Sequence, residues 1–124
     1  MERYVYCNPN PKRKAVGDCV IRALSLALDK SWEETYFDIC AQGFKMADMP
    51  SANHVWGSYL RDKGFKRMTA EPNITVSEFC ERNEQGIYIL GCDSHVLTAI
   101  DGHYCDAWDS GDEIVVYYWE LKGE

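Results

Sequence analysis

An α+β fold is the class that the sequence predicts, with N-terminal helices packed on a C-terminal antiparallel sheet. Apolar residues recur at helical spacing before Gly86, and after it they follow the pattern of extended strands. The chain has 124 residues, the length of one domain, and it shows no linker or internal repeat. Residues 1–124 are therefore expected to form a single domain.

The first predicted helix begins at a cysteine. Residues 4–6 have the pattern of a short strand, and the asparagines and prolines of residues 8–11 mark a turn. Asp18 is a good N-cap for a helix over residues 19–28, which places Cys19 in the first turn. The helical period is carried by four apolar residues, Val20, Ile21, Leu24 and Leu28. Most of this helix is expected to be buried.

Three further helices are predicted from their end signals. Ser31 and Thr75 each stand three residues before a glutamate, the capping-box spacing that opens a helix. The helix after Ser31 is expected to end near Ala41, and the helix after Thr75 is expected to be short. Between them, a helix is predicted to begin at Pro50 and to stop at Gly64.

Extended segments follow Gly86. Four strands are predicted, over residues 87–90, 95–100, 104–108 and 114–119. Asp101 and Gly102 are a strong hairpin signal between the second and third of these strands. If they form a two-residue type I′ loop, Ile100 pairs with His103.

Composition argues against several classes of function. The net charge is −7, whereas nucleic-acid binding needs concentrated positive charge. The basic cluster at residues 12–14 is short, and we interpret it as a solvated loop. Apolar runs are too short to span a membrane, and the N-terminus lacks the apolar region of a secretion signal. We expect a cytoplasmic protein that binds neither nucleic acid nor membrane and uses no cofactor.

The six cysteines are expected to be reduced thiols, because nothing in the sequence indicates a secreted protein. Cys40 and Cys80 fall on helical patterns, where a thiol behaves as a small buried hydrophobe. Cys19 differs, because unpaired amides and the helix dipole stabilise a thiolate at a helix start. The same amides can hydrogen-bond an oxyanion. Cys19 is the candidate nucleophile, and a buried structural cysteine is the alternative interpretation.

A nucleophilic cysteine needs a base, and the chain has three histidines. His54 lies in the predicted third helix, where a surface or packing role is favoured. His103 follows the hairpin turn and is expected to be exposed to solvent. His95 opens a strand after a short polar segment, so that its imidazole can face a helix start across a cleft. His95 is the candidate base.

The third member of such a site accepts a hydrogen bond from the imidazole and fixes its orientation. Asp106 and Asp109 are the candidates. With the two-residue turn, His95 lies opposite Trp108, Asp106 shares the face of His95, and Asp109 points to the other face. A turn with an odd number of residues would reverse this assignment. The turn preference favours Asp106, and Trp108 would shield the histidine–aspartate bond from water.

These motifs resemble those of papain-like cysteine peptidases. Gly17-Asp18-Cys19 at a helix start resembles the Asp-Cys-Gly start of bacteriocin-processing peptidase domains, with Val20 in place of the glycine. His95 at a strand start, followed by Asp106-Ala107-Trp108, is similar to the histidine and the Asn-Ser-Trp motif of papain. The order of cysteine helix, further helices, histidine strand and acid strand matches along most of the chain.

The resemblance implies a papain-like core and a hydrolase that attacks a peptide, isopeptide or amide bond through a thioester. It gives the triad Cys19, His95 and Asp106 and a peptide or protein substrate. Residues 8–28 and 95–119 also resemble small uncharacterised proteins of bacteriophages and their Gram-positive hosts, which would place the protein in a host cytoplasm. Peptidase, isopeptidase, deamidase and transglutaminase reactions all stay open.

Papain-like enzymes usually place a glutamine several residues before the cysteine as an oxyanion donor. Here that region reads Lys-Arg-Lys over residues 12–14. Asn8, Asn10 and Lys14 are the candidates for this supporting role.

Two alternatives compete with a cysteine hydrolase. One is a catalytically silent papain-fold module, such as a phage protein that binds a host factor. The other is a zinc site made of Cys92, His95, His103 and Cys105. Strand rise would set the two histidines roughly 25 Å apart, so these ligands are not expected to converge and no metal site is predicted.

Overall fold

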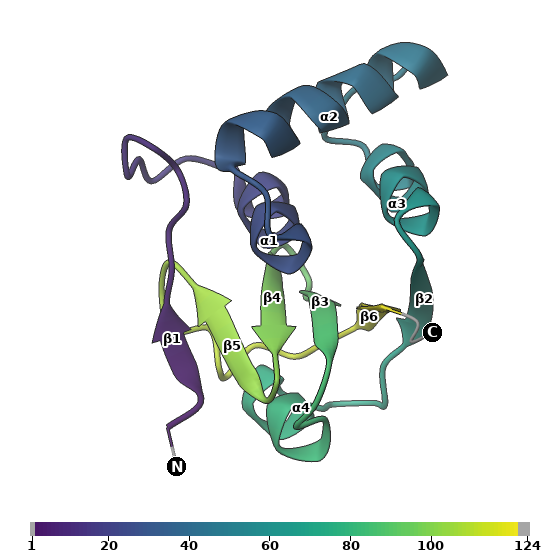
Figure 1. The fold of residues 1–124 in the computed structure, drawn as a ribbon. Coiled ribbons are helices and arrows are strands. Elements are labelled where there is room, and N and C mark those ends of the chain that lie inside the picture. The colour runs from purple at the N-terminus through teal and green to yellow at the C-terminus, as the bar shows by residue number, and fades with distance from the viewer. Residues whose placement is uncertain (1, 122–124) are drawn as a thin grey trace.

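Residues 2–121 are described by the structure, a computed structural model, and they form four helices and six strands (Figure 1). The helices are α1 (Cys19–Leu28), α2 (Trp32–Met46), α3 (Asn53–Asp62) and α4 (Val76–Arg82). The strands are β1 (Tyr4–Tyr6), β2 (Phe65–Thr69), β3 (Ile87–Gly91), β4 (Val96–Ile100), β5 (His103–Asp106) and β6 (Tyr117–Leu121). The predicted α+β class is confirmed. None of the helices in this part of the chain is both long enough and apolar enough to cross a bilayer.

The described strands belong to one sheet, in the order β1-β5-β4-β3-β6-β2. Neighbouring strands are antiparallel except for β1, which runs parallel to β5 with Val5 opposite Cys105. The last strand, β6, lies between β3 and β2. The sheet is therefore mixed and mostly antiparallel, and it includes an N-terminal strand at one edge as well as the predicted C-terminal strands.

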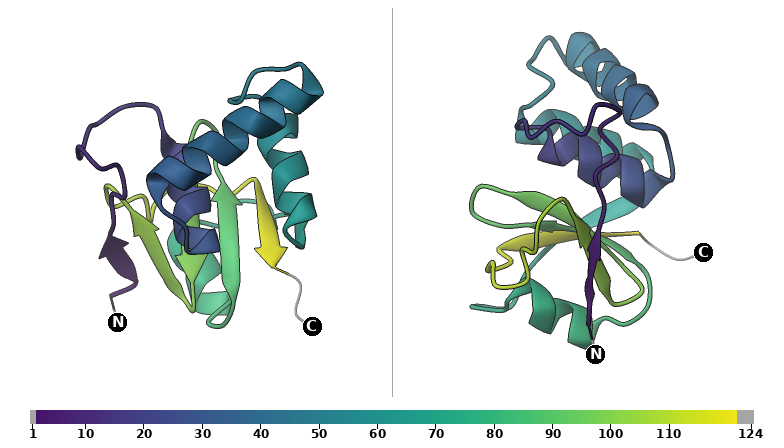
Figure 2. Two further views of the ribbon diagram at one scale, coloured as in Figure 1. Left: turned by 45° about the horizontal axis from the view of Figure 1, so that its top comes forward. Right: turned by 90° about the vertical axis from the view of Figure 1, so that its left-hand side faces the viewer.

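Helices cover both faces of this sheet. Helices α1, α2 and α3 lie on one face, and α4 lies on the other (Figure 2). Successive residues of the central strand β3 point to opposite faces, as strand geometry requires. Ile89 joins the apolar cluster of Leu24 and Trp56 beneath α1 and α3, whereas Leu90 joins the cluster of Phe79 beside α4. The central strands are thus buried on both sides, and α1 packs directly against β3 and β4.

Helices α2 and α3 depart from their predicted ends. Helix α2 continues past Ala41 to Met46, although Gly43 lies within it. A Cβ at Gly43 would lie 2.8 Å from the backbone oxygen of Asp48, so the glycine allows the chain to fold back against the helix. Helix α3 begins at Asn53, later than predicted.

The strands also differ from the sequence pattern. Strand β2 was not predicted, because it is an edge strand in which Phe65 is buried while Lys66 and Arg67 are exposed. The predicted strand over residues 104–108 stops at Asp106. The predicted strand over residues 114–119 starts only at Tyr117. The amide of Val115 donates to the carbonyl of Ile74, which lies outside the strands of the sheet.

The hairpin between β4 and β5 has the predicted two-residue turn. Asp101 and Gly102 have φ angles of 50° and 82°, the positive values that a type I′ turn requires. Ile100 pairs with His103, which confirms the predicted register. This register determines which side chains of β5 lie on the same face of the sheet as the side chains of β4 and of the residues just before β4.

Candidate active site

Cys19 is the first residue of α1, as the sequence predicted, and it is partly exposed. Asp18 occupies the N-cap position, but its side chain makes no capping hydrogen bond. The first-turn amides have no acceptor within the helix by the geometry of helix ends. The thiol therefore lies at the positive end of the helix dipole, which favours its anion.

His95 lies immediately before β4 and faces both Cys19 and Asp106. Its Nε2 is 2.6 Å from Oδ2 of Asp106. The side chain of Cys19 lies close enough to His95 for the imidazole to lower the pKa of the thiol. Because Asp106 holds Nε2, Nδ1 is the ring nitrogen available to the thiol. The structure thus brings together the three residues that the sequence singled out, from α1, from the loop before β4 and from the end of β5.

The protonation behaviour of the pair follows from these contacts. Burial acts to raise the pKa of the Cys19 thiol, but it is outweighed by hydrogen bonds from His95 and the Val96 amide and by the charges of His95 and Arg22, so the pKa is lowered. Burial acts to lower the pKa of His95, but the hydrogen bonds with Asp106 and Cys19 raise it to about 9. The arrangement favours a thiolate beside an imidazolium.

Asp106 is held rigidly at the end of β5. Its carboxylate accepts hydrogen bonds from the backbone amide of Ala107 at 2.8 Å and from the hydroxyl of Ser110 at 2.6 Å, besides the contact with His95. Only 4% of Asp106 is exposed. Asp109, the alternative acid, lies elsewhere: it accepts hydrogen bonds from the Tyr104 hydroxyl and the Gly111 amide. Asp106 is therefore the carboxylate that orients the imidazole.

Arg22 connects the acid to the start of the cysteine helix. It is buried one turn into α1, where it forms an ion pair with Asp18, and its second guanidinium nitrogen lies 3.8 Å from Asp106. Asp18 also accepts hydrogen bonds from Asn10 Nδ2 at 3.1 Å and from Trp32 Nε1 at 2.9 Å. Burial alone would raise the pKa of Asp18, but these donors and Arg22 lower it. One buried polar network thus runs from the N-terminal loop to the sheet.

Sequence reasoning missed Arg22 and Ser110. A signal for Arg22 was present, since it is a charged residue in an apolar helix, four positions after Asp18. No local pattern marks Ser110, whose hydroxyl reaches Asp106 only because the loop after β5 turns back.

The structure places the proposed oxyanion donors in the loop before α1. Asn10 is buried, donates to Asp18 and accepts a hydrogen bond from the Lys12 amide at 2.9 Å. Asn8 accepts a hydrogen bond from the Asn10 amide at 3.2 Å. Lys14 is exposed. The observed contacts of both asparagines therefore order the loop and the Asp18 network.

Trp108 lies against the imidazole. The ring centroids of His95 and Trp108 are 4.9 Å apart, and the planes are tilted by 35°. Trp108 is 46% exposed, so it covers one side of the imidazole while its outer side faces solvent. The indole restricts the ring of His95 to the orientation that both partners need.

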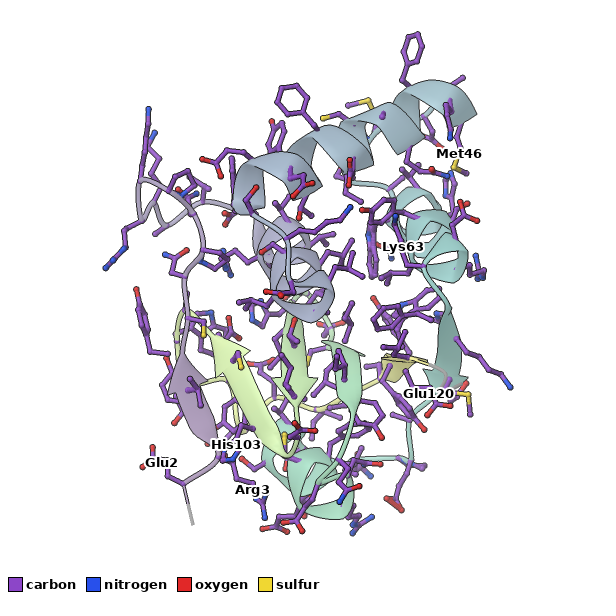
Figure 3. The ribbon with its side chains drawn as sticks, in the orientation of Figure 1. Glu2, Arg3, Met46, Lys63, His103 and Glu120 are labelled. Carbon is purple, nitrogen blue, oxygen red and sulfur yellow. The ribbon has the colours of Figure 1, made fainter. Side chains whose placement is uncertain are left out.

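The zinc ligands considered from the sequence do not converge. Within residues 2–121, no group of three or more His, Cys, Asp or Glu side chains is arranged to hold a metal ion. His103 begins β5 near Arg3 (Figure 3), whereas His95 precedes the distant start of β4. The two histidines are thus separated by the length of the hairpin.

In comparisons with known proteins, no family model, no curated protein and no solved structure matches this chain. Function must therefore be inferred from the residues and their geometry.

Proposed function

We propose that the protein is a cysteine hydrolase of peptide, isopeptide or amide bonds, with a papain-like arrangement of Cys19, His95 and Asp106. One observation carries the proposal: a partly exposed thiol at a helix start lies beside an imidazole whose Nε2 is 2.6 Å from a buried carboxylate. The nucleophile lies beside the base, and the base lies beside the orienting acid, which is the spatial arrangement that thiol catalysis uses. The order of these residues along the chain and their strand and helix settings support a papain-like core.

The reaction follows from these groups. The Cys19 thiolate attacks the carbonyl carbon, and the first-turn amides of α1 hydrogen-bond the oxyanion that forms. The His95 imidazolium gives its proton to the leaving amine, which departs and leaves a thioester on Cys19. Neutral His95 then takes a proton from water, which attacks the thioester and releases the acid. Asp106 keeps the imidazole aligned both while the thioester forms and while water hydrolyses it.

A second candidate is a binding module without turnover. Helix α2 carries Phe37 and Phe44, which are 76% and 88% exposed and lie two turns apart on one side of the helix. Exposed aromatic residues of this kind are typical of surfaces that contact other proteins. In this alternative the papain-like fold presents α2 to a partner protein, such as a factor of the host that a phage infects.

Thiol labelling separates the two candidates. We expect iodoacetamide at pH 6.5 to alkylate Cys19 faster than the other cysteines, because its lowered pKa supplies thiolate where ordinary thiols are protonated. Peptide mapping by mass spectrometry gives the rate at each cysteine. Slow alkylation of Cys19 at the rate of Cys7, which is also partly exposed, would contradict the hydrolase and favour the binding module.

A further inference from the structure

A tyrosine of the last strand reaches toward the start of α1. The oxyanion of a carbonyl attacked by Cys19 is stabilised by hydrogen-bond donors that are already in place. Asn8 and Asn10 are engaged in the loop before α1, and Lys14 is exposed there. Tyr117, the first residue of β6, comes to the site from the C-terminal part of the chain instead.

Tyr117 leans across the sheet from β6 toward β4. Gly91, the last residue of β3, pairs with Tyr117 on one side and with Val96, the first residue of β4, on the other. A Cβ at Gly91 would lie 2.1 Å from Cζ of Tyr117, so the tip of the ring, rather than its base, covers the glycine. The phenol oxygen lies beyond Cζ and therefore points on toward β4, about 4.8 Å from β3.

The ring of Tyr117 is thereby brought near the thiol. Cys19 and Tyr117 pack against the same apolar cluster, which includes Val96. The Val96 amide helps to lower the pKa of Cys19, so the sulfur lies at the start of β4. Burial is the main reason why the pKa of Tyr117 is raised, and Arg67 opposes it. The charges of Cys92 and Cys19 raise this pKa further, as expected for a phenol in the neighbourhood of the thiol.

The base and the phenol approach Cys19 from opposite directions. The strands on this side of the sheet follow the order β5-β4-β3-β6 (Figure 1). Asp106 ends β5 and contacts His95, whereas Tyr117 extends from β6. His95 faces the leaving group, because it protonates that group. The oxygen occupies another corner of the tetrahedral intermediate, so it can face the side from which Tyr117 approaches.

The Tyr117 hydroxyl is available as a donor. Within residues 2–121 it has no hydrogen-bond partner, and its oxygen is not shut off from solvent. Its raised pKa keeps it protonated at neutral pH, as donation requires. The guanidinium of Arg67 lies over the ring, 4.2 Å from its centroid, and with Gly91 it restricts the orientation of the ring. The hydroxyl is thus positioned before any substrate binds.

We propose that the Tyr117 hydroxyl donates a hydrogen bond to the oxyanion of the Cys19 reaction, together with the first-turn amides of α1. This inference rests on the proposed function, since it requires a carbonyl group that Cys19 attacks. As the bond from sulfur to the carbonyl carbon forms, the π electrons move onto the carbonyl oxygen, which accepts the hydrogen bond from Tyr117. The phenol keeps its proton, and the bond to the leaving group breaks when the oxyanion collapses to the thioester.

Two probes of Cys19 separate this role from an effect on the thiol itself. Iodoacetamide alkylates sulfur without forming an oxyanion, whereas p-nitrophenyl acetate acetylates it through one and releases p-nitrophenolate. We expect Tyr117→Phe to slow acetylation of Cys19 by about tenfold or more, less than the loss of an oxyanion donor costs with an amide, because an activated ester needs less stabilisation. Alkylation should stay at the wild-type rate. Peptide mapping by mass spectrometry gives both rates at Cys19.

Two further variants assign the effect to the position of the hydroxyl. Tyr118→Phe is the matched control, because Tyr118 is the next residue of β6 and its ring packs against Phe79 on the α4 face. It should change neither rate. Gly91→Ala keeps the Tyr117 hydroxyl but displaces the ring, since the added methyl group would occupy the place of its tip. We expect Gly91→Ala to slow acetylation while alkylation is unchanged.

The outcomes distinguish this inference from the proposed function. If Tyr117→Phe slows both reactions equally, or slows neither, Tyr117 is not an oxyanion donor. The hydrolase still stands in that case, provided that iodoacetamide alkylates wild-type Cys19 rapidly at pH 6.5. Acetylation of Gly91→Ala at the wild-type rate would also overturn the role of the phenol. If wild-type Cys19 shows no enhanced reactivity with iodoacetamide, both proposals fail together.

Discussion

The two faces of the sheet hold cysteines in opposite chemical settings. On the α1 face, the thiol of Cys19 contacts His95, and its pKa is lowered. On the α4 face, Cys80 and Cys92 lie within an apolar cluster, and burial raises their pKa values to about 11 and about 12. Burial acts in the same direction on all of them, so the difference comes from the neighbouring polar groups.

The contrast between the two faces lies in what lowers the pKa of a thiol. A helix start alone would stabilise a thiolate modestly. Here the anion also receives hydrogen bonds from His95 and the Val96 amide, and the network behind them places Arg22 nearby. On the α4 face the same kind of side chain lies in an apolar setting, where burial keeps the thiol protonated. Four changes would sharpen or break this contrast.

The largest effect is expected from Arg22→Met, which leaves Asp18 buried without its cation and removes the charge of Arg22 from beside Asp106. We expect the free energy of unfolding to fall by about 3–5 kcal/mol, as for broken buried ion pairs. Urea denaturation measures it. Arg82→Met, which breaks an exposed ion pair with Glu71, is the control and should cost less than about 1 kcal/mol. Equal losses of unfolding free energy in the two variants would show that the buried network stabilises the fold no more than an exposed ion pair does.

His95→Ala should make Cys19 resemble the thiols of the other face. We expect its alkylation by iodoacetamide at pH 6.5 to slow by about a hundredfold, because the thiolate loses its hydrogen-bonded partner. His54→Ala serves as the control, since His54 pairs with Asp48 at an exposed site. Rapid labelling of Cys19 in the His95 variant would mean that the helix start suffices.

Asp106→Ala and Asp109→Ala are a matched pair of variants, one at the last residue of β5 and one in the loop that follows it. Removing Asp106 frees the imidazole to turn and lowers its pKa, so we expect labelling of Cys19 at pH 7.5 to slow by about tenfold. Removing Asp109 disturbs Tyr104 and Gly111 and should leave the labelling rate unchanged. The opposite pattern would assign the orienting role to Asp109.

The smallest effect concerns the pH dependence of stability. The pKa of His95 rises from 6.5 to about 9 on folding, so its stabilisation is complete below pH 6.5 and is lost as pH rises through about 9. In Cys19→Ser, which removes the opposing titration of the thiol, we expect the free energy of unfolding to fall by about 1 kcal/mol over this range. Adding His95→Gln should flatten the profile. A profile that does not change on this addition would exclude His95 as its cause.

Much of the candidate site could be predicted because its signals are local. The helical period after Asp18 placed Cys19 at a helix start. Likewise, Asp101-Gly102 determined the register of the hairpin, and that register puts the side chain of Asp106 on the same face as His95. Each inference needs only neighbouring residues and one turn type, so the rest of the fold could not change it.

Other parts of the site depend on contacts between distant segments. Asp18 looked like a side-chain cap, but Asn10, Trp32 and Arg22 compete for its carboxylate and turn it away from the helix amides. Ser110 reaches Asp106 only through the path of a loop. Hydrogen-bond partners of this kind have no sequence spacing that would reveal them.

The sequence by itself determined the α+β class, the helix that begins at Cys19 and the hairpin that carries the acid, because periodicity and turn residues act over a few positions. Only the tertiary structure decided that β1 joins the sheet in parallel, that β6 inserts between β3 and β2, and that Arg22 bridges Asp18 and Asp106. The physical reason is that strand order and buried ion pairs depend on which surfaces meet when the chain collapses. The lowered pKa of the Cys19 thiol depends on both, since a local helix start becomes a candidate active site only when His95 and its network pack against it.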